Sequence, residues 1–165
     1  MTTDGEPCQE WLNRHGPALL LFARQILRDP ALAEDAVQDG FLRFWPRRRT
    51  ARDPLPLLYA AVRSAALDLL RSRRRRAVRE QAAVRREAWF DTTVEQSARA
   101  ALVQQALADL PPDQREVVVM KIWSGLTFAQ CAEALGESAN TMASRYRYAM
   151  EKIAARLAAE VQDER

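Results

Sequence analysis

The most informative residues lie near the C-terminal end of the chain, within residues 126–156. One side of this segment presents a hydroxyl, a guanidinium and a phenol group, at Ser144, Arg147 and Tyr148, beside the small side chain of Ala143. Spacings of three and four residues place side chains on one face of a helix. Such groups can bond to base edges and phosphates in a DNA major groove. The pattern predicts a DNA-reading helix, with an ordinary helical hairpin that closes a bundle as the alternative.

Two helices with a tight turn between them must position these groups. Thr127 and Gln130 have the spacing of a capping box, which predicts the start of a short helix. Gly136 predicts its end, because glycine tolerates the positive φ of a helix C-terminus. Ser138 can cap the second, longer helix. The apolar residues form two inward stripes with helical spacing: Phe128, Cys131, Ala132 and Leu135 in the first helix, and Met142, Tyr146, Ala149, Ile153 and Leu157 in the second.

The composition predicts an all-α protein. The chain of 165 residues contains only five glycines and is rich in good helix formers. No window approaches about 18 consecutive apolar residues, which argues against a membrane-spanning segment. Residues 2–10 are polar and acidic, unlike a signal peptide, which begins with a basic and then an apolar run. We therefore expect a cytoplasmic protein without membrane insertion.

Metal, disulfide and catalytic sites are not expected. Cys8 and Cys131 are isolated in the sequence, and the single histidine is His15. This set supports neither a disulfide framework nor a zinc site, and we expect no metal and no other cofactor. No nucleophile motif is present, and a carboxylate pair such as Asp35 and Asp39 does not make a catalytic constellation by itself. The sequence argues against an enzyme.

The basic residues gather in the middle of the chain. Residues 43–86 hold fourteen arginines and three acids, whereas the segments on either side hold more acids than bases. A basic block between acidic flanks is typical of a surface that binds a polyanion such as nucleic acid. A solvated arginine-rich linker would explain the run at residues 71–76, but it does not explain arginines placed inside a helix.

The hydrophobic periodicity predicts two small helical domains joined by a flexible linker. The first, residues 1–76, contains three helices: one around residues 11–27, one from about residue 31 to 45 after a break at Asp29 and Pro30, and a basic one that begins near Leu57. Residues 77–93 are the predicted linker, where the periodicity weakens. The second domain, residues 94–165, contains four helices, and the last two form the helix-turn-helix.

Three motifs in this order give the chain a family resemblance. They are AEDAVQDGFLRFW at residues 33–45, LDLLRSRRRR at 67–76, and ALADLPPDQREVVVMKIWSGLTFAQCAEALGESANTMASRYRYAMEKI at 106–153. Together they resemble an extracytoplasmic-function (ECF) sigma factor of bacterial RNA polymerase, in the sigma-70 family. The resemblance covers nearly the whole chain and implies a protein that directs core polymerase to specific promoters. A helix-turn-helix regulator that binds DNA without productive polymerase engagement is the alternative.

The resemblance implies that the second helix docks on the clamp helices of the polymerase β′ subunit. The matching positions are Asp35, Gln38, Asp39, Leu42 and Arg43. Acidic and amide side chains can pair with arginines of a partner helix through charge-assisted hydrogen bonds. Without the resemblance, a solvated helix face is the simpler interpretation of these residues.

The resemblance also implies that each of the two domains binds a different part of the promoter DNA. The basic third helix corresponds to the element that recognises and melts the minus 10 region, and residues 46–54 correspond to the loop that captures an extruded base. The matching positions of this helix are Arg63, Ser64, Asp68, Arg71, Arg74 and Arg75. The last helix corresponds to the reader of the minus 35 region, and its matching positions are Asn140, Thr141, Ala143, Ser144, Arg145, Arg147 and Tyr148.

Four positions depart from the usual family pattern. Leu57 stands where tryptophan is frequent, Ser64 where asparagine is frequent, Asn140 where glycine is frequent, and Ala143 where a basic residue is frequent. The missing basic side chain at Ala143 should shift DNA contacts to Arg147 and Tyr148. The polymerase β flap and an anti-sigma factor are further partners that the resemblance implies.

Overall fold

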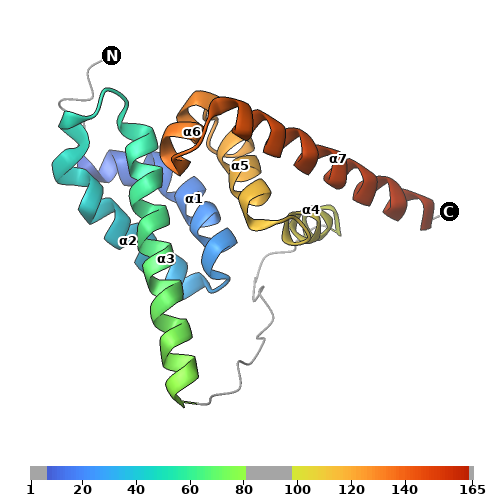
Figure 1. The fold of residues 1–165 in the computed structure, drawn as a ribbon, viewed down its shortest axis with the longest axis horizontal. Helices are drawn as coiled ribbons and strands as arrows, with labels where there is room; N and C mark the ends of the chain where they lie inside the picture. The colour runs from blue at the N-terminus through green and yellow to red at the C-terminus, as the bar shows by residue number, and fades with distance from the viewer. Residues whose placement is uncertain (1–6, 81–97, 164–165) are drawn as a thin grey trace.

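The computed structural model describes residues 7–80 and 98–163, and all regular structure in these two ranges is helical (Figure 1), which confirms the all-α prediction. The elements are α1 (Cys8–Leu27), α2 (Pro30–Phe44), the 3-10 helix η1 (Trp45–Thr50), α3 (Pro54–Glu80), α4 (Ala98–Ala108), α5 (Pro112–Ile122), α6 (Phe128–Leu135) and α7 (Ala139–Asp163). None of the described helices combines the length and the apolar composition needed to cross a membrane.

The break between α1 and α2 follows from local chemistry. Arg28 ends α1 in the left-handed conformation, with φ 57°. The Asp29 carboxylate accepts hydrogen bonds from the N–H groups of Ala31 (3.0 Å) and Leu32 (3.2 Å), which satisfies donors that the first turn leaves without partners. Pro30 occupies the first helical position, where a missing N–H removes no helical hydrogen bond. The break predicted at Asp29 and Pro30 is confirmed.

The turn between α6 and α7 has the predicted caps. The Thr127 hydroxyl accepts a hydrogen bond from the N–H of Gln130, and the Gln130 side chain accepts one from the N–H of Thr127, which completes a capping box. Gly136 ends α6 with φ 70°. The Ser138 hydroxyl accepts a hydrogen bond from the N–H of Thr141 at 3.0 Å at the start of α7. The helix-turn-helix predicted within residues 126–156 is confirmed.

Helix α3 extends beyond the predicted end of the first domain at residue 76. Residues 77–80 continue the helix to Glu80, because Ala77, Arg79 and Glu80 are good helix formers. The remainder of the predicted linker, residues 81–93, and the predicted start of the second domain at residue 94 lie outside the described residues.

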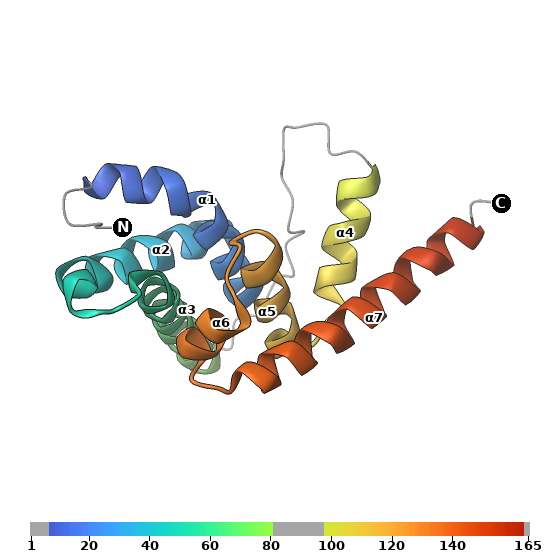
Figure 2. The ribbon, with the colours of Figure 1, turned by 90° about the horizontal axis from the view of Figure 1, so that it is seen from above.

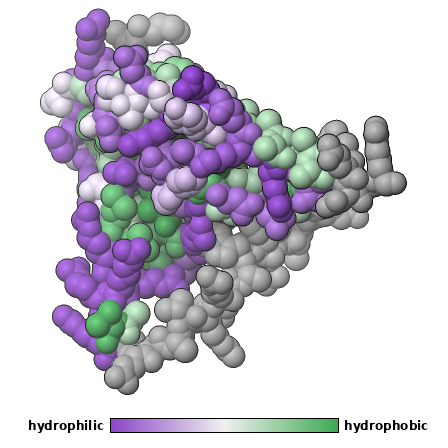
Figure 3. All heavy atoms as spheres, turned by 45° about the vertical axis from the view of Figure 1, so that its right-hand side comes forward, coloured by the Kyte–Doolittle hydropathy of each residue, from purple (hydrophilic) through white to green (hydrophobic). Residues whose placement is uncertain are grey.

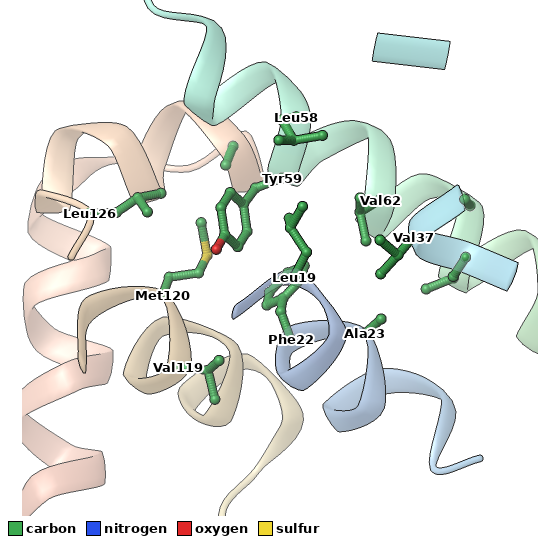
Figure 4. Packing of buried hydrophobic residues seen from close by; sticks show 14 of the residues in the cluster. Leu19, Phe22, Ala23, Val37, Leu58, Tyr59, Val62, Val119, Met120 and Leu126 are labelled. Atoms are coloured by element: carbon green, nitrogen blue, oxygen red, sulfur yellow. The ribbon is translucent and has the colours of Figure 1, made fainter. Parts of the chain in front are cut away.

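The helices before and after residues 81–97 share one apolar core. α1, α2 and α3 pack against one another, and α5 and α6 pack onto α1 and α3. Figure 4 shows the junction, where Tyr59 of α3 lies among Leu19 and Phe22 of α1, Met120 of α5, and Leu126. These five side chains are at most 1% exposed. Both predicted groups of helices are present, and they are in close contact.

Helix α7 is held by α4 and α5. A second apolar cluster joins Leu107 of α4, Leu110, Val118 of α5 and Ala149 of α7. The C-terminal half of α7 extends away from the main core, beside α4 (Figure 2). These contacts cover one side of α7 and leave its other side available.

Gly40 is required where α2 crosses α3. A Cβ at this position would lie 2.5 Å from the Cα and 2.8 Å from the backbone nitrogen of Val62, so a rotamer change of Val62 could not relieve the clash. We expect Gly40→Ala to lower the free energy of unfolding by about 1 to 3 kcal/mol, the usual range for overpacked cores. Urea unfolding followed by circular dichroism measures this change.

Gly16→Ala is the matched control, because a Cβ on Gly16 of α1 would meet no atom within 4 Å. Alanine is the better helix former, so this variant should match the wild type or gain up to about 1 kcal/mol of stability. Equal stability of the two variants would show that α2 and α3 do not approach closely at Gly40.

Candidate docking and nucleic-acid interfaces

One face of α2 carries all five residues predicted to dock a partner, and we call it the docking face. Its members are Asp35, Gln38, Leu42 and Arg43, which are exposed, and Asp39, which is half-buried. Leu42 is 71% exposed and places an apolar side chain among these polar groups. Phe41 and Phe44 of the same helix are at most 3% exposed and belong to the core. The structure therefore brings the predicted docking residues together on an accessible surface.

Ion pairs connect the docking face with α3. The Arg43 guanidinium lies 2.6 Å from an Asp39 carboxylate oxygen and 3.1 Å from one of Asp68, which also pairs with Arg71 at 3.3 Å. The hydrogen bond to Asp68, supported by Asp39, raises the pKa of Arg43. Sequence reasoning placed Asp68 only among the DNA contacts, because its pairing partner lies 25 residues away in the chain. Asp68 is thus a link between the docking face and α3.

The C-terminal half of α3 forms an exposed basic arm, which we call the arginine arm (residues 71–76). Every residue of the arm is exposed, and five of the six are arginines. This end of α3 projects from the core in Figure 1, and hydrophilic side chains line much of it in Figure 3, where a hydrophobic group is visible only near its tip. Arg73 pairs with Asp29 at 3.3 Å. Arg71, Arg74 and Arg75, the predicted DNA contacts, lie where phosphates can approach them.

Arg63 lies in a different environment from the arginine arm. Its Nε lies 2.9 Å from the Glu116 carboxylate of α5, and the two side chains are 34% and 7% exposed. Burial raises the pKa of Glu116, and the positive charge of Arg63 opposes that rise. The structure therefore places this predicted DNA contact in an ion pair between α3 and α5. The sequence signal for such a pair is an acid beside the apolar residues 117–119, because a buried acid needs a cationic partner.

Residues 46–54 are only partly a loop. Residues 46–50 belong to η1, where the Arg48 guanidinium lies 3.8 Å from the centre of the Trp45 ring and donates to the Trp45 carbonyl oxygen at 2.6 Å. Trp45 in turn stacks on Phe41, with ring centres 5.4 Å apart. The prediction of a loop was wrong for η1, because a cation–π contact and a hydrogen bond from the Arg48 side chain to a backbone carbonyl order this segment.

Helix α7 presents much of the predicted minus 35 surface to solvent. The exposed members are Asn140, Ser144, Arg147 and Tyr148, and we call them the reading face; Thr141 and Ala143 are half-buried. Met142 and Ala149, on the opposite side, are fully buried. The Arg147 guanidinium lies 4.9 Å from the centre of the Tyr148 ring. A planar donor and a phenol therefore project side by side from the reading face.

Arg145 differs from the residues of the reading face. Its guanidinium lies 3.1 Å from Asp113 of α5 and 3.1 Å from Glu137 in the turn before α7, and its side chain is 25% exposed. These two pairs tie α7 to α5 and to the turn. A DNA contact by Arg145 remains a prediction. It would require the guanidinium either to leave these two carboxylates or to bind DNA and the carboxylates at the same time.

The cysteine of the helix-turn-helix is a core residue. Cys131 is fully buried, and burial raises the pKa of its thiol to about 11. A thiol that stays protonated at neutral pH is a poor nucleophile and a poor metal ligand. Cys8 is exposed and forms no disulfide. In the part of the chain that the structure describes, no three His, Cys, Asp or Glu side chains gather into a potential metal site.

Two family models match the chain. The model of sigma-70 region 2 matches residues 11–76, and the model of sigma-70 region 4 matches residues 100–153. The first match contains the docking face and most of α3. The second contains α5, α6 and the reading face.

The chain is also similar to curated sigma factors over most of its length. It is 31% identical to the RNA polymerase sigma-E factor of Streptomyces coelicolor over 159 residues, which are 95% of this chain and 89% of the relative. It is 30% identical to the ECF RNA polymerase sigma factor SigL of Mycobacterium tuberculosis over 148 residues, which are 86% of this chain and 83% of the relative.

Two solved structures share the fold. The sigma factor RpoE from Bartonella quintana, in complex with the anti-sigma factor NepR, matches with a TM-score of 0.72 at 24% identity, over 90% of this chain and 94% of RpoE. CnrH, in complex with the cytosolic domain of CnrY, matches with a TM-score of 0.63 at 27% identity, over 92% of this chain and 88% of CnrH. Both matches extend over the helices on either side of residues 81–97.

Proposed function

The chain belongs to the sigma-70 family as an ECF sigma factor, which directs core RNA polymerase to specific promoters, and we propose how its surfaces divide that work. Sigma factors are transcription initiation factors and not enzymes. In this proposal the docking face binds the polymerase, α3 holds the minus 10 strand, and α7 reads the minus 35 duplex. The observation that carries the proposal is the exposure of the docking face and the reading face on separate helices of one chain.

The docking face combines polar and apolar side chains that can contact a helix of the β′ clamp. The carboxylates of Asp35 and Asp39 and the amide of Gln38 can accept hydrogen bonds from arginines of that helix. Leu42 adds apolar area that contact with the polymerase would remove from water. Because Arg43 pairs with both Asp39 and Asp68, the docking helix and α3 are joined in one ion-pair network.

The minus 10 strand is assigned to α3 and to residues 46–54. Opening a duplex requires a protein that binds the unpaired strand better than the paired one. The arginine arm supplies charge for the strand backbone, and residues 46–54, which lead into α3, are assigned to the extruded base. Tight binding of the separated strand would stabilise the open promoter.

A regulatory partner and a cellular location belong to the same proposal. RpoE was solved with the anti-sigma factor NepR, and CnrH with the cytosolic domain of CnrY. We propose that this chain also binds an anti-sigma factor, through surfaces that it uses for polymerase and DNA. Because a sigma factor acts together with RNA polymerase, we propose that the chain functions in the cytoplasm. Its contacts with the polymerase would include the β flap.

Transcription with purified components tests the function. DNA recovered with the chain from cells supplies candidate promoters, and core polymerase should give run-off transcripts from them only when the chain is added. Core polymerase subunits should also co-purify with the chain. Binding to this DNA without any transcript on any of the recovered promoters would support a helix-turn-helix regulator instead.

Replacing Arg74, Arg75 and Arg76 with alanine should flatten the salt dependence of single-strand binding. Each phosphate contact adds about 0.7 to the slope of log K against log salt, so the loss of three contacts lowers the slope by about 2. Fluorescence anisotropy at salt concentrations between about 50 and 200 mM gives the slope. Lysine at the same three positions keeps the charge and should keep the slope. An unchanged slope in the alanine variant would mean that these arginines are solvated and contact no phosphate.

A further inference from the structure

A column of aromatic rings runs from the core between α1 and α2 to the surface at η1. The Trp11 and Phe44 rings have centres 5.3 Å apart, and Phe44 meets Phe41 edge-on at 5.8 Å. Phe41 stacks on Trp45, with the two ring planes inclined by 21°. The Arg48 guanidinium lies over the Trp45 ring, 3.8 Å from its centre. The last member of the column is therefore a guanidinium group and not a ring.

The members of this column become more exposed towards η1. Trp11, Phe41 and Phe44 are at most 3% exposed, whereas Trp45 and Arg48 are half-buried. Phe41, Trp45 and Arg48 follow one another at spacings of four and three residues, which place them on one side of the end of α2 and of η1. The two outer groups therefore rest on a support that is itself part of the core.

Two contacts fix the Arg48 side chain before any ligand arrives. Its guanidinium covers the Trp45 ring and donates a hydrogen bond to the Trp45 carbonyl oxygen at 2.6 Å. The Thr50 hydroxyl donates to the Arg47 carbonyl oxygen at 2.7 Å and closes the last turn of η1. An arginine side chain that is free in solution loses rotamer freedom when it binds a ligand. Arg48 has already lost much of that freedom, which favours binding.

A guanidinium held in this way suits an unpaired nucleobase. The guanidinium plane, like an aromatic ring, is a surface on which a base that has left its stack can lie. Half-burial leaves part of the Arg48 side chain accessible beyond its contact with Trp45. Arg47 and Arg52 are exposed before and after it in the chain and can contact the phosphates next to such a base. The segment combines a flat group for a base with charge for the strand backbone.

We propose that the Arg48 guanidinium is the surface on which the extruded base of the minus 10 strand stacks, whatever the identity of that base. The proposal rests on the proposed function, which assigns residues 46–54 to the extruded base. Stacking uses the face of a base, which all four bases have, and not the hydrogen-bonding edge that distinguishes them. Arg48 therefore contributes affinity for the separated strand, and sequence preference in the minus 10 region comes from other residues.

Two single strands with the same phosphates test the stacking. One is a strand of about 16 thymine nucleotides, and the other has the same length but carries abasic sites in place of its bases. Arg48→Lys keeps a positive charge beside Trp45 and removes the guanidinium plane. We expect this variant of the full chain to bind the thymine strand about fivefold or more weakly than the wild type does, and to bind the abasic strand equally well. Fluorescence anisotropy measures both affinities.

Arg47→Lys is the matched control, because Arg47 is an exposed arginine of the same 3-10 helix and lies outside the aromatic column. It should bind both strands as the wild type does. Circular dichroism checks that each variant keeps its helical content. Tolerance of base identity is tested with thymine strands in which one central base is adenine, cytosine or guanine. The loss caused by Arg48→Lys should agree within about twofold among these strands, because stacking accepts every base.

Several results would overturn the proposal. A folded Arg48→Lys variant that binds the thymine strand as tightly as the wild type does would show that no base stacks on the guanidinium. Tighter binding of that strand by Arg48→Ala would place the base on the Trp45 ring, which Arg48 covers. Equal binding of the thymine and abasic strands by the wild type would refute base capture by residues 46–54 as well. Failure of the sigma-factor function itself would appear separately, as the absence of run-off transcripts.

Discussion

Asp39→Arg is expected to weaken the binding of core RNA polymerase by about tenfold or more, which corresponds to about 1.4 kcal/mol or more. The substitution replaces an acceptor for partner arginines with a like charge. In the wild type, the Arg43 guanidinium lies 2.6 Å from the Asp39 carboxylate. The substitution therefore also places two guanidinium groups side by side. The Asp39 side chain is 48% exposed in the free chain, so the stability of the chain itself should change little. Titration of fluorescently labelled chain with core polymerase measures the loss.

Three further variants separate the causes of that loss. Asp39→Asn keeps the size and removes the charge, so it should fall between the wild type and Asp39→Arg. Gln38→Ala removes one amide from the same face and should also weaken binding. Glu133→Arg makes the same charge change on an exposed position of α6 and should bind polymerase as the wild type does. If Asp39→Arg binds polymerase as tightly as the wild type does, α2 is not the docking helix. That result would favour a regulator that binds only DNA.

Arg147→Ala is expected to relax sequence preference at one position of the minus 35 element, at a cost of about 1 to 3 kcal/mol for the preferred base. The physical reason is that a guanidinium can donate two hydrogen bonds to one base edge, and Arg147 lies exposed beside Tyr148 on the reading face. Affinities for a set of duplexes that vary one base pair at a time measure the preference. An equal loss on every duplex would assign Arg147 to a phosphate.

Arg145→Ala is the matched control, two residues away on the same helix. Arg145 pairs with Asp113 and Glu137, so its loss should loosen the attachment of α7 to α5 and lower the melting temperature. The affinity for all duplexes should fall together, with no change in base preference. A change of preference at a single base pair would show that Arg145 reads DNA in the complex, as the family resemblance implies.

The helix ends could be predicted from the sequence because each cap depends on residues within one turn. Asp29, Thr127 and Ser138 accept hydrogen bonds from N–H groups two or three residues ahead, which confirms the break predicted at Asp29 and the caps predicted at Thr127 and Ser138. The docking residues came from the family resemblance, and only their position on one common face follows from local spacing. Helical spacing fixes which residues share a face, whatever the helix packs against.

Contacts between distant elements could not be predicted in the same way. Arg63 and Glu116 lie 53 residues apart, and Asp53 and Gln130 lie 77 residues apart. Neither periodicity nor capping contains information at such separations. The 3-10 helix η1 was missed for a different reason, because its order depends on one guanidinium that stacks on Trp45 rather than on a repeated pattern.

The sequence by itself determined the all-α fold, the helix ends around Asp29 and between Thr127 and Ser138, the residues that share the faces of α2 and α7, and the family, because all of these depend on local spacing or on motifs that the chain spells out. Only the tertiary structure decided which charged residues on those faces are already paired and that the two groups of helices share a core. The reason is physical: burial and ion pairing depend on which helices meet in space, and here α6, together with Glu116 of α5, meets the N-terminal part of α3.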